Sequence, residues 1–384
     1  GLAFVPTGNV AADYISTGRT PEQNKYSSAI VAIDVTTGKP RWSFQTVKMD
    51  VWDYDIGSQP SLIDYKGTPA LLVSSKQGDL YVLNRATGRP LTPVATIQAP
   101  SGGLEPKLRS PTQIVSAWNT LRKPPLRESD MWGMSPIDQM LCRIQYRQAD
   151  YRGFYTPPSA DKSSVQYPGY NGGSDWGSVS IDPVRGVAIA NYNDMPNYVR
   201  LIPRDKANKL GIKPRFASKQ LSMSSHQIDP QWGVSYGVKV NAGWRVPFTK
   251  LMCKRPPYGG IRAIDIATGR TLWDRPLGTA RRNGPFNLPT LLPFTIGTPN
   301  NGGAVTTASG LVFIAAATDD LIRAIDLRTG KTVWSATLPA GGQATPIVYQ
   351  QGDREYLVIF AGGHHFMETP MGDSVIAYAL PRSA

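Results

Sequence analysis

Short apolar runs without helical periodicity alternate with polar turns along this chain, and residues 29–44 are the first complete example. Residues 29–33, Ala-Ile-Val-Ala-Ile, form a run short enough for a buried strand. Asp34, two threonines and Gly38 follow, and a glycine can take the positive φ that a tight turn requires. The run Arg41-Trp-Ser-Phe44 then returns as a second strand. The pattern predicts a β-hairpin, and residues 1–5 predict a strand before it.

This hairpin recurs almost letter for letter. Residues 263–273 and 324–334 repeat the frame of residues 32–42, with an aspartate, a Thr-Gly-basic turn and a tryptophan eight positions after the aspartate. Residues 82–88 and 181–186 keep the strand and turn but lack the tryptophan. Because a lone hairpin leaves one face unburied, the units must stack, and the tryptophan would fill the same joint each time. The repeat predicts an all-β fold built from propeller blades.

The length of the chain bounds the number of blades. Units of about 40–50 residues would give about six to eight blades in a chain of this length. Residues 91–164 and 194–258, however, are rich in proline, basic and polar residues and are expected to be long loops. We therefore expect about five blades plus these two excursions.

Composition narrows the possible partners. The formal charge is +13, from 41 Lys and Arg against 28 Asp and Glu, and the basic residues are scattered through loops. No nucleic-acid-binding motif accompanies them, so an anionic ligand, substrate or lipid surface is the favoured partner. No apolar run is long enough to span a membrane. The first residues already predict a strand and no signal peptide, so we expect a fragment that starts within the fold, with a processed subunit as the alternative.

The two cysteines, Cys142 and Cys253, could be buried thiols or one disulfide, and the sequence leaves both open. A zinc site is not expected, because His226, His364 and His365 give no ligand-spaced cluster. There is also no Cys-x-x-Cys-His motif for a covalent c-type haem.

Several segments carry a resemblance to a known family. Residues 44–60, with Trp52-Asp53, resemble the pyrroloquinoline quinone (PQQ) dehydrogenases, and the repeat resembles their tryptophan-docking motif. Segments throughout the chain look like the membrane-bound branch, namely residues 75–84, 130–133, 138–143, 155–158, 339–346 and 371–380. Residues 167–177, 190–196 and 363–370 are more similar to quinate/shikimate dehydrogenases than to glucose dehydrogenases.

The resemblance implies an eight-bladed quinoprotein β-propeller of which residues 1–384 are the C-terminal part. The N-terminal blades and the membrane anchor would be absent. The sequence before Gly1 would supply the missing blades, with a glutamate near the metal and an aromatic residue stacked on the quinone.

The resemblance also implies roles for single residues. Asp53 would be the catalytic base and a Ca²⁺ ligand, because a carboxylate can take a hydroxyl proton and is a hard oxygen donor. Lys76 would hydrogen-bond the quinone oxygens and stabilise their developing charge. The remaining matches are Asn9 as a metal ligand, Asn191, Asp175 and Trp176 at the cofactor, and His364 at the substrate. Each has a plainer alternative, such as a turn residue, an exposed strand-end lysine or blade packing.

One position departs from the family pattern. Related enzymes commonly carry a histidine upstream of Trp52-Asp53, where this chain has Lys48-Met-Asp50. Lys48 has no assigned role, and a contact with an acidic substrate is one hypothesis.

The function implied is oxidation of quinate or shikimate to the 3-keto acid with PQQ and Ca²⁺. Electrons would pass to membrane ubiquinone on the periplasmic face of the bacterial inner membrane. The alternative is the same chemistry on glucose or on a polyol such as glycerol. A non-catalytic propeller scaffold is a third reading, but a scaffold has no need for Trp-Asp followed by a lysine on the next blade.

Overall fold

The three copies of the hairpin have the same geometry. The computed structural model describes residues 1–214, 228–231 and 233–380, and in them the copies are β2–β3, β16–β17 and β20–β21. Thr37, Thr268 and Thr329 each donate a backbone N–H to the carboxylate of the turn aspartate. Each pair of strands also shifts register at the same place, just after the alanine that faces the tryptophan. The predicted hairpins and turns are confirmed.

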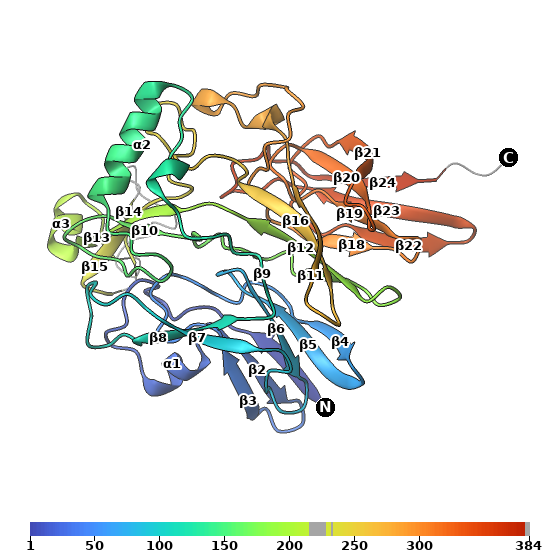
Figure 1. Cartoon of the computed structure of the whole chain (residues 1–384), viewed down its shortest axis with the longest axis horizontal. Helices are drawn as coiled ribbons and strands as arrows, with labels where there is room; N and C mark the ends of the chain where they lie inside the picture. The colour runs from blue at the N-terminus through green and yellow to red at the C-terminus, as the bar shows by residue number, and fades with distance from the viewer. Residues whose placement is uncertain (215–227, 232, 381–384) are drawn as a thin grey trace.

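Five antiparallel sheets in the described residues are the blades (Figure 1). The first contains β1 Leu2–Pro6, β2 Ala29–Asp34 and β3 Pro40–Gln45, and the second β4 Ser61–Tyr65, β5 Thr68–Ser74, β6 Asp79–Asn84 and β9 Asn119–Thr120. The third contains β11 Val179–Asp182, β12 Val187–Asn193, β16 Gly259–Asp265 and β17 Thr271–Pro276. The last two contain β18 Ala304–Thr306, β19 Leu311–Ile314, β20 Leu321–Asp326 and β21 Thr332–Thr337, then β22 Ile347–Gln351, β23 Arg354–Ala361 and β24 Ser374–Ala379.

Apolar layers between consecutive blades form the core. Leu72 and Val82 of the second blade pack against Ala188 and Ile264 of the third, and comparable layers lie in the other joints. Because each layer belongs to two blades, neither blade can bury its own apolar face alone.

Two of the three repeated tryptophans close these joints as predicted, whereas Trp334 is 39% exposed and contacts Tyr378 of the last blade edge to face. Trp42 lies over Gly88 in the turn of the second blade, and Trp273 lies over Gly330 in the turn of the fourth. Their indole N–H groups donate to Arg85 O at 3.3 Å and Leu327 O at 2.7 Å. The degenerate copy at residues 82–88, in the second blade, has no tryptophan of its own. There Trp118, from outside the repeat, packs over Gly269 in the turn of the third blade.

The two predicted excursions contain more structure than loops. Residues 91–164 include β7 Val94–Gln98, β8 Thr112–Ser116 and α2 Pro136–Gln148, so the expectation of plain loops was wrong there. A further sheet is formed by β10 Ser164–Gln166, β13 Asn197–Pro203, β15 Tyr236–Asn241 and β14 Ile228–Asp229. These elements are short and interrupted by proline and basic residues, which hid their periodicity.

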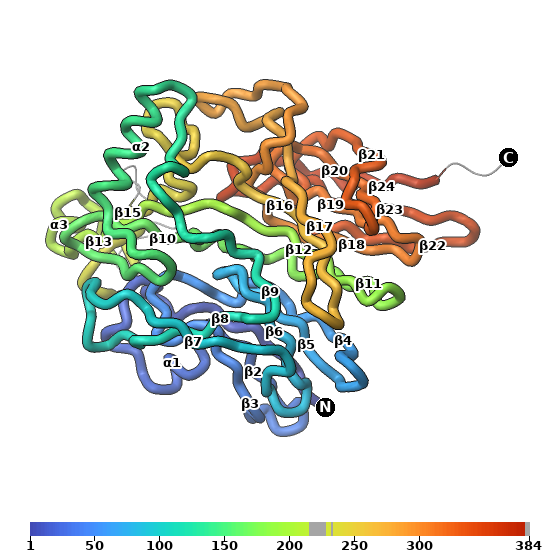
Figure 2. The backbone as a smooth tube through the Cα atoms, in the orientation of Figure 1, coloured from blue at the N-terminus to red at the C-terminus, as the bar shows by residue number. Residues whose placement is uncertain are grey.

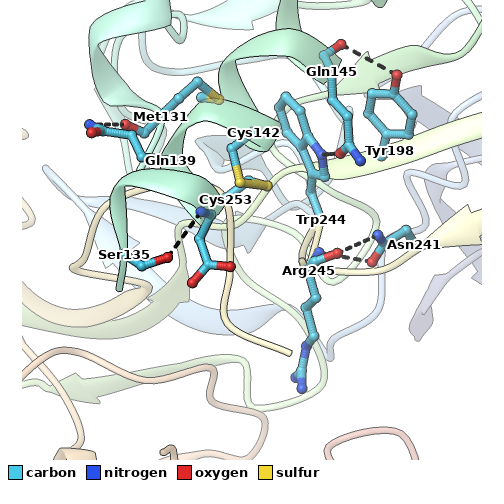
Figure 3. Close-up of a disulfide and its surroundings, with 11 residues drawn as sticks. Met131, Ser135, Gln139, Cys142, Gln145, Tyr198, Asn241, Trp244, Arg245 and Cys253 are labelled. Carbon is cyan, nitrogen blue, oxygen red and sulfur yellow. Dashed lines mark hydrogen bonds between the residues drawn. A yellow bond between two sulfur atoms is a disulfide. The ribbon is translucent and has the colours of Figure 1, made fainter. Parts of the chain in front are cut away.

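Helices are few. They are α1 Pro21–Tyr26, α2, α3 Arg204–Lys209 and the short turns η1 Glu128–Asp130, η3 Ala280–Arg282 and η4 Pro285–Asn287. Among the residues described, none of these is long and apolar enough to cross a bilayer. A disulfide joins Cys142 of α2 to Cys253, which answers the question that the sequence left open (Figure 3). His226 lies outside the described residues.

The connections between strands bring distant residues to one end of the blades. In an antiparallel blade, the loop after the second strand and the segment that enters the next blade emerge at the same end. The loops β1–β2, β5–β6 and β23–β24 and the segments entering β4 and β11 therefore emerge at the same end of their blades. Figure 2 traces the backbone through the blades and these connections. Every residue singled out from the sequence as a site residue lies on these segments or, like Asn191, near the end of β12 that leads to them.

Candidate functional site

Asp53 is held in an uncommon backbone conformation by the segment that enters β4. Its φ is +60°, in the left-handed region that non-glycine residues rarely adopt. The carboxylate of Asp50 accepts the N–H groups of Trp52 and Tyr54, both at 2.8 Å, and so clamps the backbone on either side of Asp53. Ser28 donates to the same carboxylate at 2.6 Å. Asp50, not singled out as a site residue in the sequence, is thus the residue that orients the predicted base.

Lys76, from the β5–β6 loop, reaches this turn. Its Nζ lies 3.4 Å from Asp53 Oδ1, 3.2 Å from the Asp53 carbonyl and 2.6 Å from Asp55 Oδ2. Its side chain is 6% exposed, so the pair is largely shielded from water. The structure therefore brings together the predicted base and the predicted cation and adds a second carboxylate.

The electrostatics of this group are shaped first by burial. Burial raises the pKa of the Asp53 carboxyl well above its usual value, and Lys76 offsets this only in part. Burial alone would lower the pKa of Lys76, but the carboxylates of Asp53, Asp175 and Asp55 outweigh it and raise that pKa. Lys76 is thus a permanent cation, whereas Asp53 is a carboxylate that holds a proton to a higher pH than an exposed one.

Asn9, the predicted metal ligand, is connected to the site through Asp55. Its backbone N–H donates to Asp55 Oδ1 at 2.5 Å, while its own Oδ1 accepts from the Val10 N–H and from Ser27. Asp13, four residues on, is a buried acid whose pKa is raised to about 6 by burial and then by Asp55. In residues 1–214, 228–231 and 233–380, no group of three or more His, Cys, Asp and Glu side chains is arranged to hold a metal ion.

Asp175 approaches the site from the segment entering β11. That segment crosses the Lys76 loop so closely that a Cβ on Gly172 would lie 2.6 Å from the Lys76 carbonyl oxygen, and Gly172 has φ +73°. Asp175 itself lies against Gly57, just after the Asp53 turn. Burial raises its pKa to about 6, against the opposing effect of Lys76, and its Oδ1 is buried with no hydrogen-bond partner in the structure.

Trp176 and His364 meet although they come from different blades. Their rings lie 5.2 Å apart with a 32° tilt, and Trp176 is 53% exposed. The His364 backbone N–H donates to Thr369 at 2.8 Å, while its ring Nδ1 is buried without a partner in the structure. Burial, and then the neighbouring His365, lowers the pKa of His364, so its ring is neutral at pH 7.

Asn191 and Lys48 are placed differently. Asn191 is buried in β12, and its amide nitrogen donates to Asn300 Oδ1 at 2.7 Å and to the Gly302 carbonyl at 3.0 Å. Both amide hydrogens are thereby used within the chain, so only its oxygen could face a ligand. Lys48 is exposed, and Gln113 pairs with its backbone N–H and carbonyl at 2.8 and 2.7 Å.

Other side chains at the site gave no sequence signal. Tyr170 and Tyr14 are buried near Asp53, whose charge adds to the effect of burial in raising both phenol pKa values, that of Tyr170 to about 12. Their positions depend on the inserted sheet, which no repeat predicts.

Asp55 differs from these tyrosines, because the sequence did offer a signal for it. An aspartate two residues after a catalytic candidate, on an extended segment, can contact the same partner.

Comparison with known proteins gives an independent result. Residues 1–357 match the family model described as PQQ: glucose/ethanol/alcohol dehydrogenase, β-propeller domain. The chain is 55% identical over 99% of its length to the glycerol dehydrogenase large subunit of Gluconobacter oxydans, covering 52% of that protein. It is 40% identical to the quinoprotein glucose dehydrogenase of Escherichia coli and 39% identical to a probable quinate dehydrogenase (quinone) of Xanthomonas campestris pv. juglandis, covering 99% and 98% of this chain and 48% of each relative. The chain thus spans about half the length of these relatives.

A solved structure agrees on the fold. The quinohemoprotein alcohol dehydrogenase from Comamonas testosteroni superposes with a TM-score of 0.58 at 19% identity, over 98% of this chain and 46% of that one.

Proposed function

Because the chain belongs to the PQQ-dependent β-propeller dehydrogenase family, we propose that it oxidises a polyol at the Asp53–Lys76 site, with glycerol as the first substrate to test. The observation that carries the proposal is the contact between a buried lysine and a partly buried carboxylate at the common end of the blades. Such a pair suits proton removal beside a fixed positive charge.

The residues around this pair fit a flat, acidic quinone. Trp176 offers a half-exposed aromatic surface, and Lys76 offers a buried cation. Asp175 Oδ1 and His364 Nδ1 are buried polar atoms without partners in the structure, so a bound group would complete them. PQQ, when bound, supplies the quinone carbonyl that accepts a hydride from the substrate.

The chain's own residues would handle the proton and the charge. Lys76 faces Oδ1 of Asp53, so we assign Oδ2 of Asp53 to removal of the substrate's hydroxyl proton. Asp50 fixes the direction of that carboxylate through the two backbone N–H groups it accepts. Lys76, held by Asp55, keeps its charge at every pH of interest and favours the ionised form of its neighbours.

The metal assignment stays a prediction. Asp53 and Asn9 could each offer an oxygen to Ca²⁺, but the described side chains do not form a complete ligand set, and the Asn9 oxygen already has two donors. No step above depends on a metal. Retention of PQQ after chelation, measured with and without added Ca²⁺, tests the assignment.

A polyol is favoured over an acidic substrate by the chemistry of the site mouth. Recognition of the carboxylate of quinate calls for a cation, whereas His364, the residue predicted to contact the substrate, is neutral at pH 7. The higher identity to a glycerol dehydrogenase subunit points the same way. The predicted quinate or shikimate activity therefore stands as the second candidate. It is supported by the similarity of residues 167–177 and 363–370 to quinate/shikimate dehydrogenases.

One assay compares the candidates. Dye-linked oxidation by the PQQ-reconstituted protein would be measured on glycerol, glucose, quinate and shikimate at equal concentrations. We expect glycerol to give the highest kcat/KM. Higher kcat/KM on quinate and shikimate would overturn the polyol assignment and keep the site. Absence of both turnover and PQQ binding would contradict the site and favour the scaffold interpretation.

The electron acceptor and location are proposed with the function. The Cys142–Cys253 disulfide is typical of an oxidising compartment, which supports the periplasmic location expected from the sequence. Membrane ubiquinone is the acceptor we propose there.

A further inference from the structure

A cluster of large apolar side chains is exposed far from the Asp53 turn in the sequence. It consists of Phe248 and five residues of the segment around η4, Phe286, Leu288, Leu291, Leu292 and Phe294, which are between 45% and 79% exposed. Phe248 and Phe286 touch edge to face at 5.6 Å. Contiguous patches of this kind on a protein surface mark contact with another apolar phase or partner.

Helix α2 adds a second apolar stripe. Ile137, Met140, Leu141 and Ile144 follow the spacing of one helix face and are 40% to 65% exposed. The opposite face holds Cys142, whose disulfide to Cys253 ties α2 to the segment that also carries Phe248 (Figure 3). Figure 1 shows α2 and the segment around η3 and η4 along the same edge of the molecule. We call these residues together the apolar edge.

Basic side chains outnumber acidic ones around the apolar edge. Residues 243–258 and 280–296 contain six basic and no acidic side chains. Lys254 is buried against Asp194, and Arg245, Arg255 and Arg282 pair with Glu368, Asp130 and Asp320. Lys250 and Arg281 are the two with no ion pair among the described residues. On α2, Arg143 and Arg147 flank the stripe and share Glu128 at 2.8 and 2.9 Å. A surface that combines apolar side chains with a basic border is complementary to an anionic lipid interface.

Several backbone N–H groups of the exposed segment are bonded within the chain. The backbone N–H of Gly284 donates to the Leu288 carbonyl, and that of Leu288 donates to the Pro285 carbonyl. The N–H of Phe286 donates to the Thr249 carbonyl at 2.7 Å, and that of Leu291 to the Arg281 carbonyl at 2.9 Å. A loop that enters the lipid interface needs this, because acyl chains offer no hydrogen bonds. Phe286 and Leu291 also have φ +59°, where Asn, Asp or Gly would be more easily accommodated.

From these observations we propose that the apolar edge binds an anionic phospholipid surface directly, with the segment 286–294 and the α2 stripe entering the headgroup region. The proposal goes beyond the proposed function and does not depend on it, since neither PQQ nor turnover takes part. It differs from anchoring by an N-terminal segment, because here the propeller's own insertions make the contact. A lipid surface is favoured over a protein groove because the apolar side chains stand on loops and a helix with basic neighbours.

Co-sedimentation of the purified full-length protein with vesicles tests the proposal. Vesicles would contain phosphatidylethanolamine with phosphatidylglycerol, and matched vesicles would contain phosphatidylcholine alone. The test variant is Leu291→Asp with Phe294→Asp, because aspartate tolerates the left-handed backbone of Leu291. The control variant is Val184→Asp with Val333→Asp, which adds the same charges at exposed apolar positions outside the apolar edge. Circular dichroism and thermal melting would confirm that both variants are folded.

The wild type should bind the anionic vesicles at least about tenfold more tightly than the neutral ones. The Leu291→Asp, Phe294→Asp variant should lose at least about tenfold in binding, while the control stays within about twofold. Failure of the wild type to bind protein-free vesicles would overturn the proposal. Equal binding by the two variants would overturn it as well, and so would binding that appears only with a second polypeptide.

Discussion

At the scale of single residues, the site centres on the carboxylate of Asp53, whose pKa is set by opposing effects. Asp53 is buried, which raises its pKa, and Lys76 at 3.4 Å only partly reverses the effect. The charge of Asp55 raises the pKa of Asp53, and Asp55 also contacts the Lys76 Nζ at 2.6 Å. In the proposed mechanism, the pH at which Asp53 becomes active as a base is therefore set mainly by burial, then by Lys76 and Asp55.

This balance predicts the pH dependence of catalysis. A general base acts only when it is deprotonated, so kcat/KM should fall as the pH drops below the raised pKa of Asp53. Asp55→Asn removes a neighbouring negative charge and frees Lys76, and both changes lower the pKa of Asp53. The acidic limb of the kcat/KM profile should then move to lower pH. A shift to higher pH, or no shift, would show that Asp53 is not the titrating base.

Lys76 can be tested against another buried lysine. Lys76→Gln leaves Asp53 and Asp55 without their cation, so we expect PQQ affinity to fall at least about tenfold and kcat/KM by about 10²–10⁴. Lys254→Gln removes an equally buried lysine that does not pair with Asp53. The Nζ of Lys254 lies 3.0 Å from the carboxylate of Asp194. This substitution should change stability but leave PQQ affinity within about threefold, as measured by fluorescence titration. Equal loss in both variants would reduce Lys76 to a structural role.

At the scale of elements, the hairpin repeat was predictable and the insertions were not. Strand, turn and tryptophan follow from local spacing, and the sequence therefore predicts β2–β3 within one residue and the turns of β16–β17 and β20–β21 at the right place. Trp118 shows the limit of this reasoning, since it fills the joint at Gly269 from outside any repeat. Helix α2 was missed although Ile137, Met140, Leu141 and Ile144 recur at the spacing of one helix face, and its buried face is completed by a disulfide to a distant segment.

The docking of tryptophan on glycine predicts a difference between two turn glycines. Gly330 and Gly186 have φ of +70° and +65°, but only Gly330 has a tryptophan against it, with a Cβ built there lying 2.7 Å from the Trp273 ring. Gly186→Ala should lower the free energy of unfolding by about 1–2 kcal/mol from backbone strain alone. Gly330→Ala should lose a further 1–3 kcal/mol or so, because the ring must move. Equal losses in chemical denaturation would contradict docking at this joint.

The disulfide predicts that the wild type is more stable than a cysteine-free variant only while the bond is oxidised. Cys142 and Cys253 close a loop with a sequence separation of 111, so replacing both with alanine should lower the free energy of unfolding by about 2–5 kcal/mol. Adding a reductant should reproduce this loss in the wild type and leave the double variant unchanged. A variant as stable as the oxidised wild type would contradict a structural role for the bond.

At the scale of the whole molecule, the site exists only because several blades share one end. Asn9, Asp53, Lys76, Asp175 and His364 come from segments that are separate in sequence, and only the antiparallel order of the blades brings them to one face. The sequence could suggest these residues through resemblance to a family. It could not show that Asp50 clamps Asp53 or that Asp55 connects Asn9 to Lys76. Those contacts depend on loops whose shapes no spacing rule specifies.

The proposed reaction requires Asp53 to accept the hydroxyl proton, and a single substitution tests this role. PQQ-dependent oxidation of glycerol would be compared between the wild type and Asp53→Asn, with PQQ binding titrated in both. Asparagine keeps the shape and cannot accept the proton, so kcat should fall by about 10²–10⁴ while PQQ binding is retained. A variant that binds PQQ and keeps its activity within about twofold of the wild type would show that Asp53 is not the base.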